Sequence, residues 1–107
     1  VVEKTRFSAF TEEVQAALAQ HKPQNVILIG CEAHICVLQT AWDLRGQGFE
    51  VYVPQECVTS RTAANKQNGI DQMREASVHI SNIESLLFQM LQDAQHPQFK
   101  NISKLIA

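Results

Sequence analysis

The sequence predicts an α/β protein whose parallel strands form one doubly wound sheet. Strand-like apolar runs alternate with segments of helical spacing along the 107 residues. The run 26–29 consists only of β-branched residues and leucine, which is typical of strands covered on both faces. Strands that alternate with helices are joined in parallel by right-handed crossovers. In such sheets ligands bind beyond the carboxyl ends of the strands, so we expect the site there.

The first helix and the first strand have clear local signals. Thr11 is a typical N-cap residue, and the two glutamates that follow it suit the positive end of a helix. We expect this helix to end near His21, before Pro23. The strand 26–29 comes next and ends at Gly30.

After that glycine the spacing becomes helical. Apolar side chains fall on neighbouring turns, and two glycines close the predicted helix. These residues are Ile35, Leu38, Ala41 and Trp42, followed by Gly46 and Gly48. A second strand over 49–53 ends at Pro54, which cannot donate to a sheet.

Three further elements and a tail complete the prediction. They are a helix over 62–75, a strand over 78–80 and a helix over 83–93. The pair Asn68–Gly69 is also a common turn signal, which weakens the first of these helices. Asn82 can cap the second helix, and we expect a short tail helix over 99–106 to lie on the body of the protein.

Composition restricts the class of protein. With 45% hydrophobic and 19% charged residues the chain is an ordinary folded domain with one core. The formal net charge of −2 and the lack of a basic block argue against a nucleic-acid partner. No apolar run is long enough for a membrane span. Three cysteines are an odd count, which favours a reducing cytoplasmic compartment over a disulfide framework.

Cys36 stands at the predicted start of the second helix. Unpaired N–H groups and the positive helix end favour a thiolate there, and the same N–H groups can accept a developing oxyanion. Free cysteine is also among the most frequently buried residues. Spacing alone therefore leaves Cys36 either a nucleophile or a packing residue, whereas Cys31 and Cys57 are predicted to pack.

Cofactor and metal sites lack their usual signals. Cys31, His34 and Cys36 cluster within six positions but do not form the Cys-x-x-Cys pairing of zinc sites. The sequence has no Gly-x-Gly-x-x-Gly and no P-loop motif. We expect neither a cofactor nor a metal.

Four segments together resemble the carboxyl-terminal half of the isochorismatase-like cysteine hydrolases. They are EKTRFSAF, GCEAHICVLQTAWDL, GFEVYVPQECVTSR and DAQHPQFKNISKLI, the last being similar to the subgroup of isochorismatase domain-containing proteins. The resemblance implies a three-layer α/β/α, Rossmann-like fold that is incomplete in this chain. Residues 1–107 would be the carboxyl-terminal part of a single domain without its amino-terminal strands. Together with the first residue, Val1, this indicates a fragment or a processed product.

The resemblance also implies roles for individual residues. Cys36 matches the nucleophile and Lys4 the lysine of an Asp-Lys-Cys triad. The peptide bond between Cys31 and Glu32 matches a cis peptide of the family, which aims the amides of Glu32 and Cys36 at a substrate oxygen. His34 lies in this loop, where support by hydrogen bonding is the favoured role over acid-base chemistry.

Other features of the family have no counterpart in the sequence. The triad aspartate comes from the first strand of the family, upstream of Val1. Glu3, Glu12 and Glu13 are nearby acids, but they fit a solvated loop and a helix start better. In the family the strand 26–29 pairs with that first strand, so we expect an open apolar edge here.

Two functions from different classes follow from these observations. The first is hydrolysis of a small amide or related carbonyl compound by Cys36, in a homo-oligomer or with a complementing amino-terminal segment. The alternative is a binding or assembly module without turnover, in which Trp42 and the tail helix could form an interface. Nucleic-acid processing is a third class, which only a salt-dependent RNA affinity would support.

Overall fold

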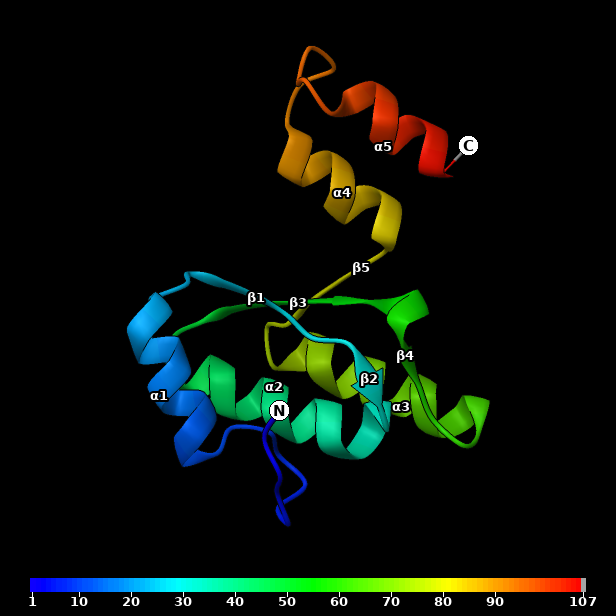
Figure 1. Ribbon diagram of the computed structural model, residues 1–107. Coiled ribbons are helices and arrows are strands. Elements are labelled where there is room, and N and C mark those ends of the chain that lie inside the picture. The colour runs from blue at the N-terminus through cyan, green and yellow to red at the C-terminus, as the bar shows by residue number, and fades with distance from the viewer. Residues whose placement is uncertain (107) are drawn as a thin grey trace.

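The computed structural model, which describes residues 1–106, contains the predicted helices and strands in their order and two short strands, β2 and β4, that were not predicted (Figure 1). The elements are α1 (Glu12–His21), β1 (Asn25–Ile27), β2 (Gly30–Cys31), a π-helical turn η1 (Ala33–Val37), α2 (Leu38–Gly46), β3 (Glu50–Pro54), a 3₁₀ turn η2 (Gln55–Cys57), β4 (Val58–Thr59), α3 (Ala63–Glu75), β5 (His79–Ser81), α4 (Ile83–Leu91) and α5 (Phe99–Ile106). No helix within this range is both long and apolar enough to cross a bilayer.

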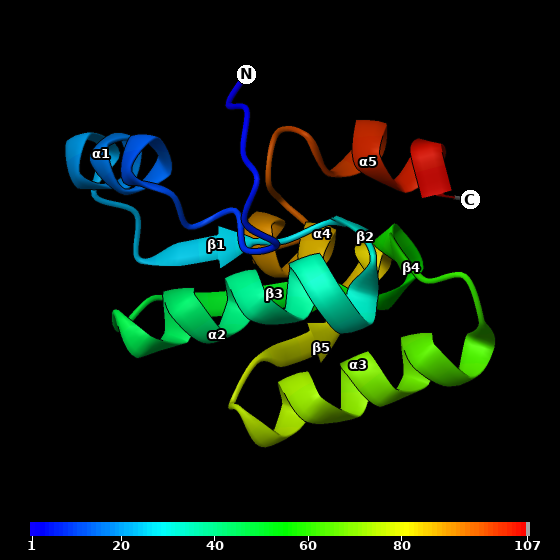
Figure 2. The same cartoon turned by 90° about the horizontal axis from the view of Figure 1, so that it is seen from below.

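The strands are parallel, as predicted. One sheet has the order β1-β3-β5, with Val26 opposite Val51 and Tyr52 opposite His79. A second, two-stranded sheet pairs β2 with β4. Helices α2 and α3 lie on one face of the larger sheet and α4 lies on the other, which gives the three layers of the predicted α/β class (Figures 1 and 2).

The core lies between the larger sheet and the pair α2 and α3. Val51 and Val53 of β3 are fully buried, as are Ala41 of α2 and Met73 of α3. Tyr52 points to the opposite face because side chains alternate along a strand, and it is only half-buried. One face of the sheet therefore carries most of the packing that holds the domain together.

The first predicted strand differs from the prediction in length and in burial. Regular pairing stops at Ile27, and Gly30, with a φ of 126°, begins the separate strand β2. Ile27, the last residue of β1, and Ile29, which lies between β1 and β2, are 47% and 65% exposed. Strand β1 is also an edge strand of its sheet. The expected open apolar edge is present, and the prediction of a strand covered on both faces is wrong for this chain.

The helices follow their capping signals. Thr11 accepts a hydrogen bond from the Val14 amide, and α1 ends at His21 as predicted. Helix α4 ends at Leu91, two residues before the predicted end at residue 93. The residue that follows Leu91, Gln92, adopts a positive φ. The tail helix α5 is present, but it packs beside α4 and not on the sheet (Figure 1). The ring centroids of Phe88 on α4 and Phe99 on α5 lie 6.0 Å apart.

The Asn68–Gly69 pair lies inside α3, so its turn signal is overridden. A Cβ atom at Gly69 would lie 2.8 Å from the backbone Cα and N of His34 and 2.9 Å from the carbonyl carbon of Ala33. Such distances are too short for a side chain to exist there. Glycine at this position lets α3 pack directly on the backbone of η1.

We predict that Gly69→Ala destabilises the fold by about 1–3 kcal/mol, because the added methyl group meets rigid backbone. This outweighs the gain in helix propensity of up to about 1 kcal/mol. Urea denaturation would measure the change. Gly46→Ala is the matched control, since a Cβ there meets nothing within 4 Å, and equal effects of both substitutions would contradict the packing argument.

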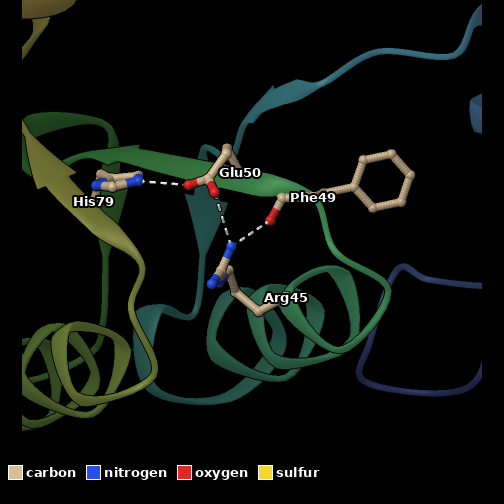
Figure 3. Close-up of polar contacts among 4 residues, drawn as sticks. All are labelled: Arg45, Phe49, Glu50 and His79. Atoms are coloured by element: carbon tan, nitrogen blue, oxygen red, sulfur yellow. Dashed lines mark hydrogen bonds and ion pairs between the residues drawn. The ribbon is translucent and has the colours of Figure 1, made fainter.

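A polar cluster joins the ends of α2, β3 and β5 (Figure 3). The Glu50 carboxylate bonds to His79 Nε2 at 2.7 Å and to Arg45 Nη1 at 3.4 Å, and Arg45 Nη1 also donates to the Phe49 carbonyl at 2.9 Å. The His79 ring stacks on Tyr52 with centroids 4.6 Å apart. The hydrogen bond from His79, followed by the charge of Arg45, lowers the pKa of Glu50 below its ordinary value of 4.5.

We predict that Glu50→Gln destabilises the protein at neutral pH and that this difference shrinks in acid. A carboxylate with a depressed pKa contributes stability above about pH 4.5, which is lost as the pH falls through its lower folded value. Thermal unfolding of both proteins between pH 7 and pH 3 would measure it. Glu75→Gln is the control, because Glu75 makes no ion pair within residues 1–106. A difference that stays constant with pH would contradict the assignment.

Candidate functional site

The candidate site is a small open hollow at the carboxyl end of β1. It has a volume of about 190 Å³ and is lined by Lys4, Cys31 and Cys36 together with apolar neighbours such as Phe7 and Ile29. Hollows of about 360–480 Å³ elsewhere on the surface are larger but contain no cysteine. The chemistry of its walls, and not its size, distinguishes this hollow as the site.

Cys36 lies in the π-helical turn η1 and is half-buried. The prediction that it starts an α-helix is therefore corrected, since α2 begins only at Leu38. The amides of Ile35 and Val37 both donate to the Glu32 carbonyl, at 3.1 and 3.2 Å. Within the described residues the amide of Cys36, which lies between them, makes no bond to that carbonyl. The Cys36 amide therefore takes no part in the hydrogen bonds that the Ile35 and Val37 amides make to the Glu32 carbonyl.

The carbonyl side of Cys36 is fixed by Thr40. The Thr40 hydroxyl donates to the Cys36 carbonyl at 2.7 Å and accepts from the Ala9 amide at 2.8 Å. Thr40 is also buried. This contact joins the amino-terminal segment that carries Lys4 to the turn that carries the cysteine.

Lys4 forms part of the same hollow, but its ammonium is bound by its own segment. Its Nζ donates to the carbonyls of Arg6 and Phe7, at 2.8 and 3.0 Å. No hydrogen bond joins Nζ to the sulfur of Cys36 anywhere in residues 1–106. The structure brings the two residues to one hollow without a hydrogen bond between their reactive atoms.

The peptide bond between Cys31 and Glu32 is cis, at the position that the family resemblance indicates. The Glu32 carboxylate lies 3.1 Å from Arg61 Nε and 3.7 Å from His34 Nε2. His34 Nδ1 lies 2.9 Å from the hydroxyl of Ser60. The loop before Cys36 is therefore joined through side chains to the segment that follows β4.

Ser60 and Arg61 were not singled out from the sequence. Their only signal is position: they follow β4, the parallel neighbour of β2, so they leave the sheet at the same end as the Cys31–Glu32 bond (Figure 2). Figure 2 also shows β2 leading into the turn before α2, with α3 alongside.

The other cysteines and candidate ligands have different environments. Cys31 is exposed, so the prediction that it packs is wrong. Among residues 1–106 β2 pairs with β4 alone, and no strand there pairs with its other edge. Cys57 is half-buried, and all three cysteines are free thiols. In the part of the chain that the structure describes, no three His, Cys, Asp or Glu side chains are arranged to hold a metal.

The remaining residues considered from the sequence lie away from this hollow. Glu12 and Glu13 are exposed in the first turn of α1. Glu3 is exposed too and borders a neighbouring hollow. Trp42, on α2, is 45% exposed.

Comparison with known proteins gives a consistent family. The model of the Isochorismatase domain matches residues 1–85. Isochorismatase domain-containing protein 2 of Danio rerio is 42% identical over 105 residues, which are 97% of this chain and 53% of that protein. A Phytophthora sojae protein described as the secreted isochorismatase effector Isc1 is 41% identical over 108 residues, which are 99% of this chain and 51% of that protein.

Solved structures agree with this similarity. The MAR1 ribonuclease structure from Caenorhabditis elegans superimposes with a TM-score of 0.89 at 38% identity, over 96% of this chain and 53% of that one. The nicotinamidase PncA of Bacillus subtilis gives a TM-score of 0.71 at 27% identity, over 75% and 45%. This chain spans about half the length of the relatives that it matches.

Proposed function

This chain belongs to the isochorismatase family and has its hydrolase fold, and from this premise we propose that Cys36 is the nucleophile of a hydrolase acting on a small amide or related carbonyl compound. One observation supports the proposal above the others. Cys36 lines a hollow together with Lys4, in the turn that follows a strand at its carboxyl end. Two of the similar solved structures are described as nicotinamidases, which supports the proposal of an amide substrate.

The proposed reaction has two steps. The sulfur of Cys36 forms a bond to the carbonyl carbon, and the amides of Glu32 and Cys36 stabilise the negative oxygen. The bond to the leaving amine then breaks, the amine takes up a proton, and a thioester remains on Cys36. Water hydrolyses this thioester to release the acid and restore the thiol. The charge of Lys4 favours the anionic states, and a carboxylate from outside this chain would carry the proton, as the family resemblance implies.

We predict that iodoacetamide at pH 6 modifies Cys36 about tenfold faster than the exposed Cys31, because Cys36 shares its hollow with the positive charge of Lys4, which favours attack by the sulfur. Lys4→Gln should slow the reaction of Cys36 several-fold, since the hollow then loses its positive charge. Peptide mapping by mass spectrometry would give the rate at each cysteine. Lys100→Gln on α5 is the control for the loss of one lysine. A Cys36 that reacts no faster than Cys31 or Cys57 excludes an activated nucleophile.

The second candidate function is assembly, and the open edge of β1 favours it. Ile27 and Ile29 lie at this edge and Phe7 lies close to it, with exposed fractions of 47%, 65% and 59%. An unpaired, apolar strand edge is a template for pairing with another chain. We propose a homo-oligomer or a complementing amino-terminal segment as the occupant of this edge. Ile29 also lines the hollow of Cys36, so an occupant of this edge would border the proposed site.

We predict that the purified chain self-associates and that Ile27→Lys with Ile29→Lys returns it to a monomer, because charge on an edge strand opposes pairing. Sedimentation velocity over a range of concentrations would show the shift. Leu105→Lys is the matched control, since Leu105 is 78% exposed but lies on α5. A wild-type chain that is monomeric at every concentration would rule out self-assembly through this edge.

A small-molecule substrate is proposed over a nucleic acid. The formal charge of −2 supports this choice, although a similar structure is described as a ribonuclease. Three free thiols support the proposed cytoplasmic location, whereas one relative is described as secreted.

A further inference from the structure

The loop from Cys31 to Cys36 is held on two sides by groups outside it. On one side α3 approaches the backbone of Ala33 and His34 at Gly69, where no Cβ would fit. On the other side the side chains of Glu32 and His34 reach the segment after β4. The first contact limits how far the loop can move toward the helix, and the second limits how far it can move away.

We propose that Glu32, His34, Ser60 and Arg61 form a polar clamp whose role is to position the Cys36 turn. The chain of contacts runs from Arg61 Nε to Glu32 at 3.1 Å, from Glu32 to His34 Nε2 at 3.7 Å, and from His34 Nδ1 to the Ser60 hydroxyl at 2.9 Å. With a proton on Nε2, facing the carboxylate, Nδ1 accepts the hydrogen bond of Ser60. These are positioning residues, because they act through the backbone of the turn.

The clamp acts on the two amides of the proposed oxyanion site. Glu32 contributes its side chain to the clamp, its amide to that site and its carbonyl to the amides of Ile35 and Val37. Movement of the Glu32 backbone would therefore disturb three groups at once, and the contacts of its side chain oppose that movement. Clamping this one residue fixes both the start of η1 and the direction of its amide.

The members of the clamp differ in strength. The side chain of Arg61 is 88% exposed, and its ion pair with Glu32 is screened by water. The side chains of His34 and Glu32 are only 19% and 23% exposed, so the contact of His34 with Ser60 is better shielded. The loss of Ser60 should therefore have a larger effect than the loss of Arg61.

Amide hydrogen exchange tests the clamp without reference to activity. We expect Ser60→Ala to speed exchange of the Ile35 and Val37 amides about fivefold, the loss expected for one ordinary hydrogen bond. Ser60→Thr keeps the hydroxyl and should restore slow exchange. Arg61→Gln should have a smaller effect, and Arg74→Gln is its matched control, since Arg74 forms an exposed ion pair with Asp71 on α3. Unchanged exchange in Ser60→Ala would overturn the clamp.

Alkylation of Cys36 in the same variants separates the clamp from the proposed function on which its catalytic role rests. We expect Ser60→Ala to slow alkylation of Cys36 several-fold relative to Cys57, with recovery in Ser60→Thr. Faster exchange together with an unchanged alkylation rate would support the clamp and count against the proposed nucleophile. Equal slowing at Cys36 and Cys57 would indicate a general loss of structure and would overturn the specific role of Ser60.

Discussion

The close contact between α3 and η1 at Gly69 is the constraint on which the site depends. A helix can lie this near another backbone only where a residue lacks a side chain, and here the distances from a hypothetical Cβ are 2.8–2.9 Å. The contact fixes the backbone of Ala33 and His34 against the core that α2 and α3 form with β3. Because Cys36 follows two residues later in the same turn, the packing of α3 also constrains where its backbone lies.

The rest of the site is built around this fixed turn. Thr40 joins the turn to the amino-terminal segment, which carries Lys4 to the same hollow. On the opposite side His34 and Glu32 reach Ser60 and Arg61. Segments from several parts of the sequence thus meet at the carboxyl ends of parallel strands, where α/β proteins commonly bind ligands. Family membership gives this arrangement a chemical interpretation, while the contacts explain how the chain holds it.

The part of the fold that depends on local signals could be predicted. Thr11 and Asn82 accept hydrogen bonds from amides in the first turns of α1 and α4, so these two helices begin where their caps predict. Thr62 caps α3 in the same way, although it was predicted as the first residue of that helix. The family resemblance indicated the position of the cis peptide. The caps need only a few neighbouring residues to specify them, whereas the position of the cis peptide rests on the family resemblance alone.

The features that depend on distant residues could not be predicted in this way. The run 26–29 was expected to be one buried strand, but Gly30 pairs with Val58 in a separate sheet. The π-helical geometry of η1 depends on the bond from Val37 to the Glu32 carbonyl and on the space left by Gly69. Exposure of Cys31 depends on a strand edge with which no strand of residues 1–106 pairs. In each case tertiary contacts overrode a local pattern.

The proposed function requires the sulfur of Cys36 to attack a carbonyl carbon whose oxygen is held by the amides of Glu32 and Cys36. The most direct measurement is an NMR titration of the ¹⁵N-labelled chain with benzaldehyde carrying ¹³C at its carbonyl. We expect a hemithioacetal on Cys36, with the amide signals of Glu32 and Cys36 shifting most. An adduct that forms equally on Cys57, or one on Cys36 that leaves both amide signals in place, would contradict the account.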